Sequence, residues 1–152
     1  MPSPRLKEFL DQQNVKYITI SHSLAFTSLD IAKSAHIPTK QLAKTVILKI
    51  NGQASMVVSP AAYKIDIENL SAAFRGATIE LADEEEFMHW FPDCEVGAMP
   101  PFGNLYDMDV YVAERLTEND DIAFNAGSHL EVIQMHYKDF ETLVKPKLVI
   151  LE

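Results

Sequence analysis

The amino-acid sequence predicts a single α/β domain of the α+β type, in which a mixed, mostly antiparallel β-sheet is flanked by helices. Two observations predict this fold class. Helical periodicities and β-rich runs are interspersed along the chain without a strict βαβ order, which favours a mixed sheet over a doubly wound one. The length of 152 residues and the hydrophobic content of 47% suit one globular core. We therefore expect residues 1–152 to form one domain.

The first elements are predicted from capping residues and periodicity. Residues 3–10 combine an N-capping serine, a proline suited to the first helical position and an apolar stripe at helical spacing. Residues 15–20 alternate as a short strand. Thr27 and Asp30 then have the spacing of a capping box, with Asp in place of the usual Glu, and indicate a helix that ends ahead of Pro38.

The clearest local signal is a β-hairpin. Two β-rich runs, residues 44–50 and 53–59, are separated by Asn51-Gly52, the strongest short signature of a two-residue hairpin turn. In that register Lys44 lies opposite Ser59. Because side chains alternate between the two faces along a strand, Lys44 then shares a face with alternate apolar residues of its own strand.

The remaining elements are predicted from the same signals. They are helices at residues 66–74, 83–90 and 137–144, and strands at residues 78–81, 110–113, 122–124, 130–135 and 147–151, the last as an edge strand.

Composition excludes several classes of protein. The net charge of −9 argues against a protein that grips DNA or RNA through a broad basic surface, although it allows contact with the end of an RNA. No apolar run approaches the roughly 20 residues that cross a bilayer, and the N-terminus lacks the pattern of a signal peptide. The single cysteine, Cys94, fits a reducing compartment. We expect a cytoplasmic protein with neither DNA nor a membrane among its partners.

The loop at residues 97–103, Gly-Ala-Met-Pro-Pro-Phe-Gly, is predicted to be rigid. Its two consecutive prolines fix two φ angles, and the glycines at both ends allow a ligand to approach the backbone closely. A stiff loop that exposes backbone N–H groups can hold a carbonyl or an oxyanion. The alternative is an ordinary connection between two elements.

Lys44 is the leading candidate for a functional cation. A lone charge in line with core residues is costly unless it has a partner or lines a cavity. An ammonium that faces a pocket could hold a phosphate, a hydroxyl or a carbonyl. The alternative is that Lys44 lies at the open end of its strand and extends its ammonium to water.

Two histidine-containing segments are further candidates. Gly127-Ser128-His129 lies in the predicted turn between the strands at residues 122–124 and 130–135, where it could place an imidazole at the mouth of a pocket or form a plain hairpin. His22, at the end of the first predicted strand, could bind a ligand or be an ordinary surface residue.

No metal or cofactor is expected. The histidines show no HExxH spacing, and one cysteine cannot build a cysteine-rich zinc site. The sequence has neither a GxSxG elbow nor a phosphate-binding glycine loop. Cys94, close to the rigid loop, leaves a cysteine–histidine nucleophile as an alternative, but single cysteines of intracellular proteins are mostly structural.

These segments, taken in order, resemble the YbaK/prolyl-tRNA-synthetase-associated domain family of aminoacyl-tRNA deacylases. The resemblance covers roughly residues 6–144. The segments that carry it are Ser21-His22-Ser23, Lys44-Thr45-Val46-Ile47-Leu48 with its Asn51-Gly52 turn, Val58-Ser59-Pro60-Ala61, the loop from Gly97 to Gly103, and Asn125-Ala126-Gly127-Ser128.

The resemblance implies a YbaK-like editing domain that hydrolyses the ester between tRNA and a wrongly attached amino acid, most often in Ala-tRNA(Pro) or Cys-tRNA(Pro). The family's lysine corresponds to Lys44 and its loop glycine to Gly97, and these two are the expected catalytic residues. The expected substrate-binding residues are His22, Phe26, Thr27, Ser59, Met99, Pro100, Gly127, Ser128 and His129. A histidine at 129 departs from some relatives and leaves the preferred amino acid open.

The same resemblance suggests how the site would work. Lys44 would fix the terminal phosphate or ribose, and backbone N–H groups of the Gly97 loop would stabilise the oxyanion. Either water or the ribose 2′-OH could be the nucleophile. The expected partners are the aminoacyl-tRNA acceptor end and either prolyl-tRNA synthetase or an elongation factor. A non-catalytic binding module of the same fold and a hydrolase that uses Cys94 are the alternatives.

Overall fold

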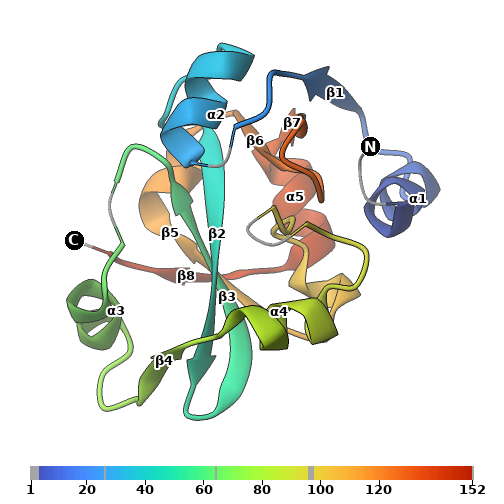
Figure 1. Cartoon of the computed structure of the whole chain (residues 1–152). Coiled ribbons are helices and arrows are strands. Elements are labelled where there is room, and N and C mark those ends of the chain that lie inside the picture. Colours follow the sequence, from blue (N-terminus) through green and yellow to red (C-terminus); the bar gives the residue numbers. More distant parts are fainter. Residues whose placement is uncertain (1–3, 26, 64, 96–97, 152) are drawn as a thin grey trace.

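The structure is a computed structural model that describes residues 4–25, 27–63, 65–95 and 98–151. Within these residues, eight strands form a single mixed sheet, and helices pack on both of its faces (Figure 1). The fold class expected from the sequence is therefore confirmed.

Most of the expected elements are present, with boundaries that shift by one or two residues. The helices are α1 (Pro4–Gln12), α2 (Ser28–Ala35), α3 (Ile67–Ala73), α4 (Glu84–Trp90) and α5 (Tyr137–Val144), and two short 3-10 helices are η1 (Gly103–Leu105) and η2 (Glu114–Glu118). The strands are β1 (Tyr17–Ser21), β2 (Leu42–Ile50), β3 (Gln53–Pro60), β4 (Ile79–Leu81), β5 (Asp109–Ala113), β6 (Asp121–Asn125), β7 (Glu131–His136) and β8 (Lys147–Val149). The two 3-10 helices were not predicted.

The hairpin of β2 and β3 has the predicted register. Ile50 pairs with Gln53, and Lys44 pairs with Ser59. Both turn residues have positive φ angles, 52° at Asn51 and 82° at Gly52, as a type I′ turn requires. A two-residue turn therefore fixes which residues of the two strands face each other.

Side-chain caps set the starts of the helices. Thr27 accepts a hydrogen bond from the backbone N–H of Asp30 at 3.1 Å, which confirms the predicted cap of α2. At α4 the bonds are reciprocal: Asp83 accepts from the N–H of Glu86 at 2.8 Å, and Glu86 accepts from the N–H of Asp83 at 3.2 Å. Such caps satisfy backbone donors that the first turn of a helix leaves without partners.

The sheet has the strand order β1-β7-β6-β2-β3-β5-β8, and β4 also pairs with β2. Four pairings are antiparallel, and those of β2 with β6, β3 with β5 and β5 with β8 are parallel. The parallel junction of β2 with β6 is short, because it joins only Leu42 to Ala123 and Ala43 to Phe124. The pairing of β2 with β4 begins further along, at Leu48.

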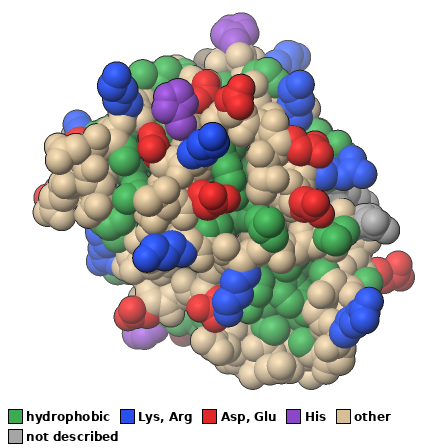
Figure 2. Space-filling view, turned by 180° about the vertical axis from the view of Figure 1, so that it is seen from behind, with side chains coloured by type: hydrophobic (Ala, Val, Ile, Leu, Met, Phe, Trp, Pro, Cys, Tyr) green, Lys and Arg blue, Asp and Glu red, His purple; other side chains and the backbone are tan. Residues whose placement is uncertain are grey.

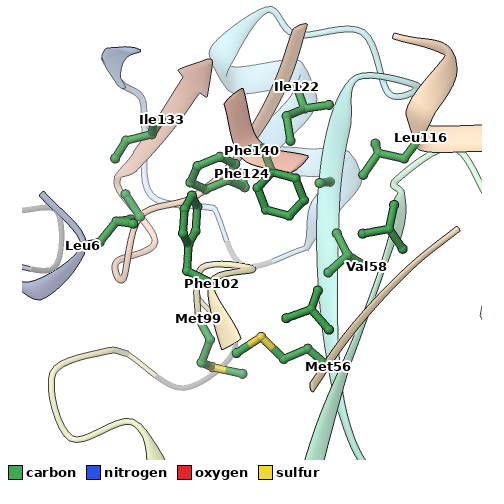
Figure 3. Packing of buried hydrophobic residues seen from close by; sticks show 14 of the residues in the cluster. Leu6, Met56, Val58, Met99, Phe102, Leu116, Ile122, Phe124, Ile133 and Phe140 are labelled. Carbon is green, nitrogen blue, oxygen red and sulfur yellow. The ribbon is translucent and has the colours of Figure 1, made fainter. Parts of the chain in front are cut away.

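The main core fills one face of the sheet. Phe102 lies at its centre, with ring centroids 5.4 Å from those of both Phe124 and Phe140 (Figure 3). Leu6 and Leu10 of α1 are fully buried against this cluster, as the apolar stripe predicted. Together these contacts attach α1 and α5 to the sheet.

The opposite face carries two smaller clusters. One joins α2 to the sheet through Ile31 and Leu42, and the other joins α3 through Leu48 and Leu70. Figure 1 shows α2 near the upper end of β2 and α3 at its lower left. Lys44 belongs to the part of β2 that lies between these clusters.

Candidate active site

Lys44 is the first residue of β2 beyond the junction with β6. Its side chain lies on the face shared by Leu42 and Leu48, and is partly buried between the two smaller clusters. The ammonium donates a hydrogen bond to the backbone carbonyl of Tyr63 at 2.5 Å. Among the described residues no carboxylate lies within ion-pair distance of it. Burial lowers the pKa of the Lys44 ammonium, because desolvation disfavours its charge.

Ser59 lies directly across the hairpin from Lys44 and is 2% exposed. Its hydroxyl oxygen is buried and makes no hydrogen bond to the described part of the chain. Ser59 therefore does not hold the Lys44 ammonium, a role that falls to the Tyr63 carbonyl. A buried hydroxyl without a partner costs stability, so its presence calls for an explanation in function.

Asn125 was not among the site residues expected from the sequence, which named it only within the turn segment that carries the family resemblance. It is the last residue of β6 and directly follows Phe124, which pairs with Ala43, so it lies beside Lys44. Alternation puts its side chain on the same face as Lys44. Its Oδ1 atom is buried and lacks a hydrogen-bond partner within the described residues. Only the pairing of β2 with β6 reveals this neighbour.

Backbone hydrogen bonds join the turn at Gly127 to the loop before Phe102. The N–H of Gly127 donates to the carbonyl of Ala98 at 2.9 Å, and the N–H of Glu95 donates to the carbonyl of Gly127 at 2.8 Å. Gly127 has a φ of 101°, a conformation that favours glycine. Gly97, the other expected catalytic residue, lies outside the described residues.

The two histidine-containing segments meet beside this turn. The backbone N–H of Ala25 donates to the carbonyl of His129 at 3.4 Å. The backbone N–H of His22 donates to the carbonyl of Leu130 at 2.8 Å. The N–H of His129 itself donates to the carboxylate of Glu95 at 3.2 Å. The structure thus brings together the predicted segments around His22, Ala98 and Gly127 at the end of β6, the strand that pairs with β2 directly before Lys44.

The other predicted site residues have structural roles of their own. Thr27 caps α2, and the hydroxyl of Ser128 accepts the N–H of Leu130 at 3.3 Å. Pro100 is buried, and Met99 packs into the main core beside Phe102 (Figure 3). Phe26 lies outside the described residues. Contact of these residues with a substrate stays a prediction.

Cys94 is poorly suited to be a nucleophile. Burial raises the pKa of its thiol to about 11, so the reactive thiolate is scarce near neutral pH. Its sulfur lies 3.4 Å from the hydroxyl of Tyr106, which also donates to the carboxylate of Asp93 at 3.2 Å. These contacts are those of a structural thiol, which disfavours the cysteine hydrolase.

Three further observations concern metal ligands, membrane-spanning helices and surface charge. Within the described residues, no group of three His, Cys, Asp or Glu side chains is placed to hold a metal ion. No helix in the same part of the chain is long and apolar enough to cross a membrane. On the face shown in Figure 2, basic side chains are interspersed with acidic ones and form no continuous patch.

Comparison with known proteins decides the family. A profile of the aminoacyl-tRNA editing domain family matches residues 22–143. The chain belongs to the aminoacyl-tRNA editing domain family. The matched range contains Lys44 and the segments that meet at the end of β6, and the family and the deacylase class expected from the sequence are confirmed.

The relatives of this editing domain are consistent with the family assignment. It is 25% identical over 150 residues to the multifunctional Ser/Thr-tRNA deacylase ProXp-y of Escherichia coli (strain K12), with 95% of this chain and 89% of the relative covered. The same identity and coverage hold for ProXp-y of Escherichia coli O157:H7. A solved structure of a protein proposed to be a trans-editing enzyme for prolyl tRNA synthetase has a TM-score of 0.82 and 16% identity, over 99% of this chain and 96% of that one. The latter supports the fold.

Proposed function

We propose that this editing domain acts in trans and hydrolyses the ester between the terminal ribose of a tRNA and a small, wrongly attached amino acid. The observation that carries the proposal is the environment of Lys44. Its partly buried ammonium has one hydrogen bond, to a backbone carbonyl. By register, Lys44 lies opposite Ser59 on β3 and follows the residue pair that precedes Asn125 on β6, and the buried oxygens of Ser59 and Asn125 lack partners within the described residues. Polar groups left in this state are suited to bind a polar ligand.

Lys44 would act by holding the acceptor end in place. An aminoacyl ester is already activated, so orientation of its carbonyl contributes more than a strong base. The ammonium keeps two N–H donors beyond the bond to Tyr63, and they can bind the ribose or the terminal phosphate. Backbone N–H groups of the Gly97 loop would stabilise the oxyanion, a contribution of about 2.7–4 kcal/mol per donor. The nucleophile would be a water molecule or the ribose 2′-OH.

The proposed substrates carry small side chains. Alanine and cysteine on tRNA(Pro) are the first candidates, and the E. coli relatives, named Ser/Thr-tRNA deacylases, add serine and threonine. A synthetase separates amino acids that differ by one methylene by only about 1–3 kcal/mol, so a second hydrolytic site is useful for such substrates. The Asn125 Oδ1 acceptor favours a substrate with a donor nearby, either the α-ammonium or a side-chain hydroxyl.

Affinity for the tRNA would come largely from a partner protein. The net charge of −9 opposes tight binding of a polyanion by this domain alone. Prolyl-tRNA synthetase or an elongation factor would present the acceptor end to the site. Binding of bare tRNA that is both tight and strongly salt-dependent would contradict this part of the proposal.

The test is single-turnover hydrolysis of Ala-tRNA(Pro), Cys-tRNA(Pro), Ser-tRNA and Thr-tRNA, with cognate Pro-tRNA(Pro) alongside. We expect the wild type to release one or more mischarged amino acids rapidly and to spare the cognate. Lys44→Ala should slow the reaction by about 100-fold, because misplacement of a substrate by an ångström costs that much. Lys49→Ala is the matched control, since Lys49 lies on the same strand but pairs with Glu86 at 2.9 Å.

Hydrolysis at no more than the spontaneous rate for every ester would contradict the proposal. The non-catalytic binding module would then be favoured. Equal losses in Lys44→Ala and Lys49→Ala would show that the effect comes from the strand rather than from the position of the Lys44 ammonium.

A further inference from the structure

A cavity lies beside Ser59, on the side of Lys44 away from the Gly127 turn, and combines polar side chains with apolar ones such as Pro60 and Ile65. Its lining includes Ser59, Tyr63, Asn69 and Arg115. Ser59 is 2% exposed, and its hydroxyl oxygen is buried and lacks a hydrogen-bond partner in the described part of the chain. A cavity with a guanidinium at its edge and such a hydroxyl on its wall is suited to a polar, anionic ligand.

Arg115 is held over this cavity by Tyr63. Its guanidinium lies 4.6 Å from the centroid of the Tyr63 ring and donates a hydrogen bond to the Tyr63 hydroxyl at 2.9 Å. The backbone carbonyl of the same tyrosine accepts the hydrogen bond from Lys44. One residue therefore positions two cations, Lys44 on the active-site side and Arg115 on the cavity side.

Strand order places the two sides on opposite flanks of β2. On one flank, β6 brings Asn125 and the Gly127 turn beside Lys44. On the other flank, β3 brings Ser59 and the cavity. A ligand whose central part binds Lys44 would extend towards both flanks of β2. An aminoacyl ester has this bipartite form, with an amino acid at one end and a nucleotide at the other.

We propose that the cavity beside Ser59 binds the nucleotide part of the acceptor end, with Arg115 on the phosphodiester that precedes the terminal nucleoside. The inference rests on the proposed function and adds the direction in which the substrate lies. The amino acid points towards Asn125 and the Gly127 turn, and the RNA leaves across Tyr63 and Arg115.

Three features support this direction. A guanidinium binds a phosphate through two parallel N–H donors, which suits a phosphodiester. Tyr63 is 43% exposed and offers aromatic surface to an unstacked base. Glu114 and Glu118 border an adjacent depression that shares Arg115, so like-charge repulsion would keep the phosphate on the Tyr63 side.

The test compares two substrates that differ in the phosphodiester. One is full aminoacyl-tRNA, and the other is 3′-O-aminoacyl-adenosine, which has the same ester without the phosphate. Arg115→Gln should raise KM for the tRNA substrate about tenfold, the effect of losing one charge-assisted hydrogen bond. It should leave kcat/KM for the nucleoside substrate within twofold. Arg115→Lys keeps the positive charge but loses the paired N–H donors of the guanidinium, so its KM for the tRNA substrate should lie between those of the wild type and Arg115→Gln.

Arg5→Gln is the matched control. Arg5 also lies over a tyrosine, 4.9 Å from the ring centroid of Tyr106, and also donates to an oxygen, the carbonyl of Leu105 at 3.2 Å. It belongs to α1, which packs on the main core rather than on the face of Lys44. Its substitution should change neither reaction. In addition, Arg115→Gln should reduce the slope of log kcat/KM against log salt by about 0.7, as expected for one lost phosphate contact to a single strand.

Equal losses on both substrates would overturn the inference, because they would mean that Arg115 acts only through Tyr63 on Lys44. No loss on either would also overturn it. If the wild type hydrolyses neither substrate, the proposed function fails. The cavity can then still be tested by measuring the binding of a nucleotide ligand. The dinucleotide cytidylyl-adenosine should perturb the NMR signals of Tyr63 and Arg115 in the wild type, and should perturb those of Tyr63 less in Arg115→Gln. If millimolar dinucleotide leaves the wild-type signals unchanged, the site is refuted.

Discussion

The two faces of the sheet are built from the same strands but differ in what they contain. Three pairs of adjacent residues show the difference: Ala43 and Lys44 on β2, Val58 and Ser59 on β3, and Phe124 and Asn125 on β6. The first member of each pair packs in the main core. The second lies on the opposite face, where Lys44 has a lowered pKa and the other two carry buried oxygens without partners in the described residues.

This division shows how one sheet can serve stability and chemistry at once. Side chains alternate along a strand, so neighbouring residues are separated by the full thickness of the sheet. The aromatic cluster on one face can hold the strands in place while the other face keeps polar groups that reduce stability. Substitutions of adjacent residues should therefore have opposite consequences.

The largest effect is expected from Phe124→Ala. The ring is fully buried against Phe102, so its removal should lower the free energy of unfolding by about 3–5 kcal/mol. Urea denaturation measures the change. Hydrolysis by the molecules that stay folded should be unaltered. A loss of less than about 1 kcal/mol, or a selective loss of activity, would break the comparison between the faces.

Asn125→Ala should do the reverse. We expect kcat/KM to fall about tenfold, the effect of one lost hydrogen bond to a charged or polar substrate group, while stability is unchanged or rises. Asn119→Ala is the matched control, because its amide donates to the carbonyl of Lys40 at 2.8 Å and of Leu116 at 3.2 Å. That variant should lose stability and keep its activity. If Asn125→Ala instead loses stability and keeps its activity, Asn125 has a structural role.

A smaller effect is expected from Ser59→Ala. Because the hydroxyl has no hydrogen-bond partner in the described residues, its removal should not lower the free energy of unfolding, and a gain of up to about 1 kcal/mol is expected. Ser34 provides the contrast, since its hydroxyl accepts the N–H of Ser23 at 3.0 Å. Ser34→Ala should cost about 1 kcal/mol. Thermal denaturation of both variants checks the difference, and a clear loss of stability in Ser59→Ala would contradict it.

The smallest effect on activity is expected at Cys94. Cys94→Ala should keep deacylation within twofold of the wild type. The thiol pKa of about 11 lies above the ordinary value of 9.0, so the group is protonated at neutral pH and its thiolate appears only as the pH rises through the raised pKa. The alkylation rate of the native protein, followed against pH, should therefore rise later than that of a free thiol. A fast reaction at pH 8 would reopen the cysteine mechanism.

Local signals in the sequence predicted much of the fold. The Asn51-Gly52 turn fixed the pairing of Lys44 with Ser59, because a two-residue loop allows one register. Thr27 predicted the start of α2 through the hydrogen bond that its side chain makes. Such features depend on residues that are close together along the chain.

The rest depends on contacts between distant segments, for which the sequence carries no local signal. The parallel pairing of Ala43 with Phe124 brings Asn125 beside Lys44, and periodicity alone does not reveal which strands are neighbours. The contact of Arg115 with Tyr63 joins residues 52 positions apart. The hydrogen bond from Lys44 to the carbonyl of Tyr63 likewise joins residues 19 positions apart, and no local pattern predicts it.

The short junction between β2 and β6 has a mechanical consequence. Two residue pairs, Leu42 with Ala123 and Ala43 with Phe124, join the β1-β7-β6 part of the sheet to the remainder. A ligand that reaches from Asn125 across Lys44 to Ser59 would contact both parts of the sheet and restrain their motion relative to each other. The amide protons at this junction would then exchange with solvent more slowly, so that occupancy of the site could be followed without labelling the ligand.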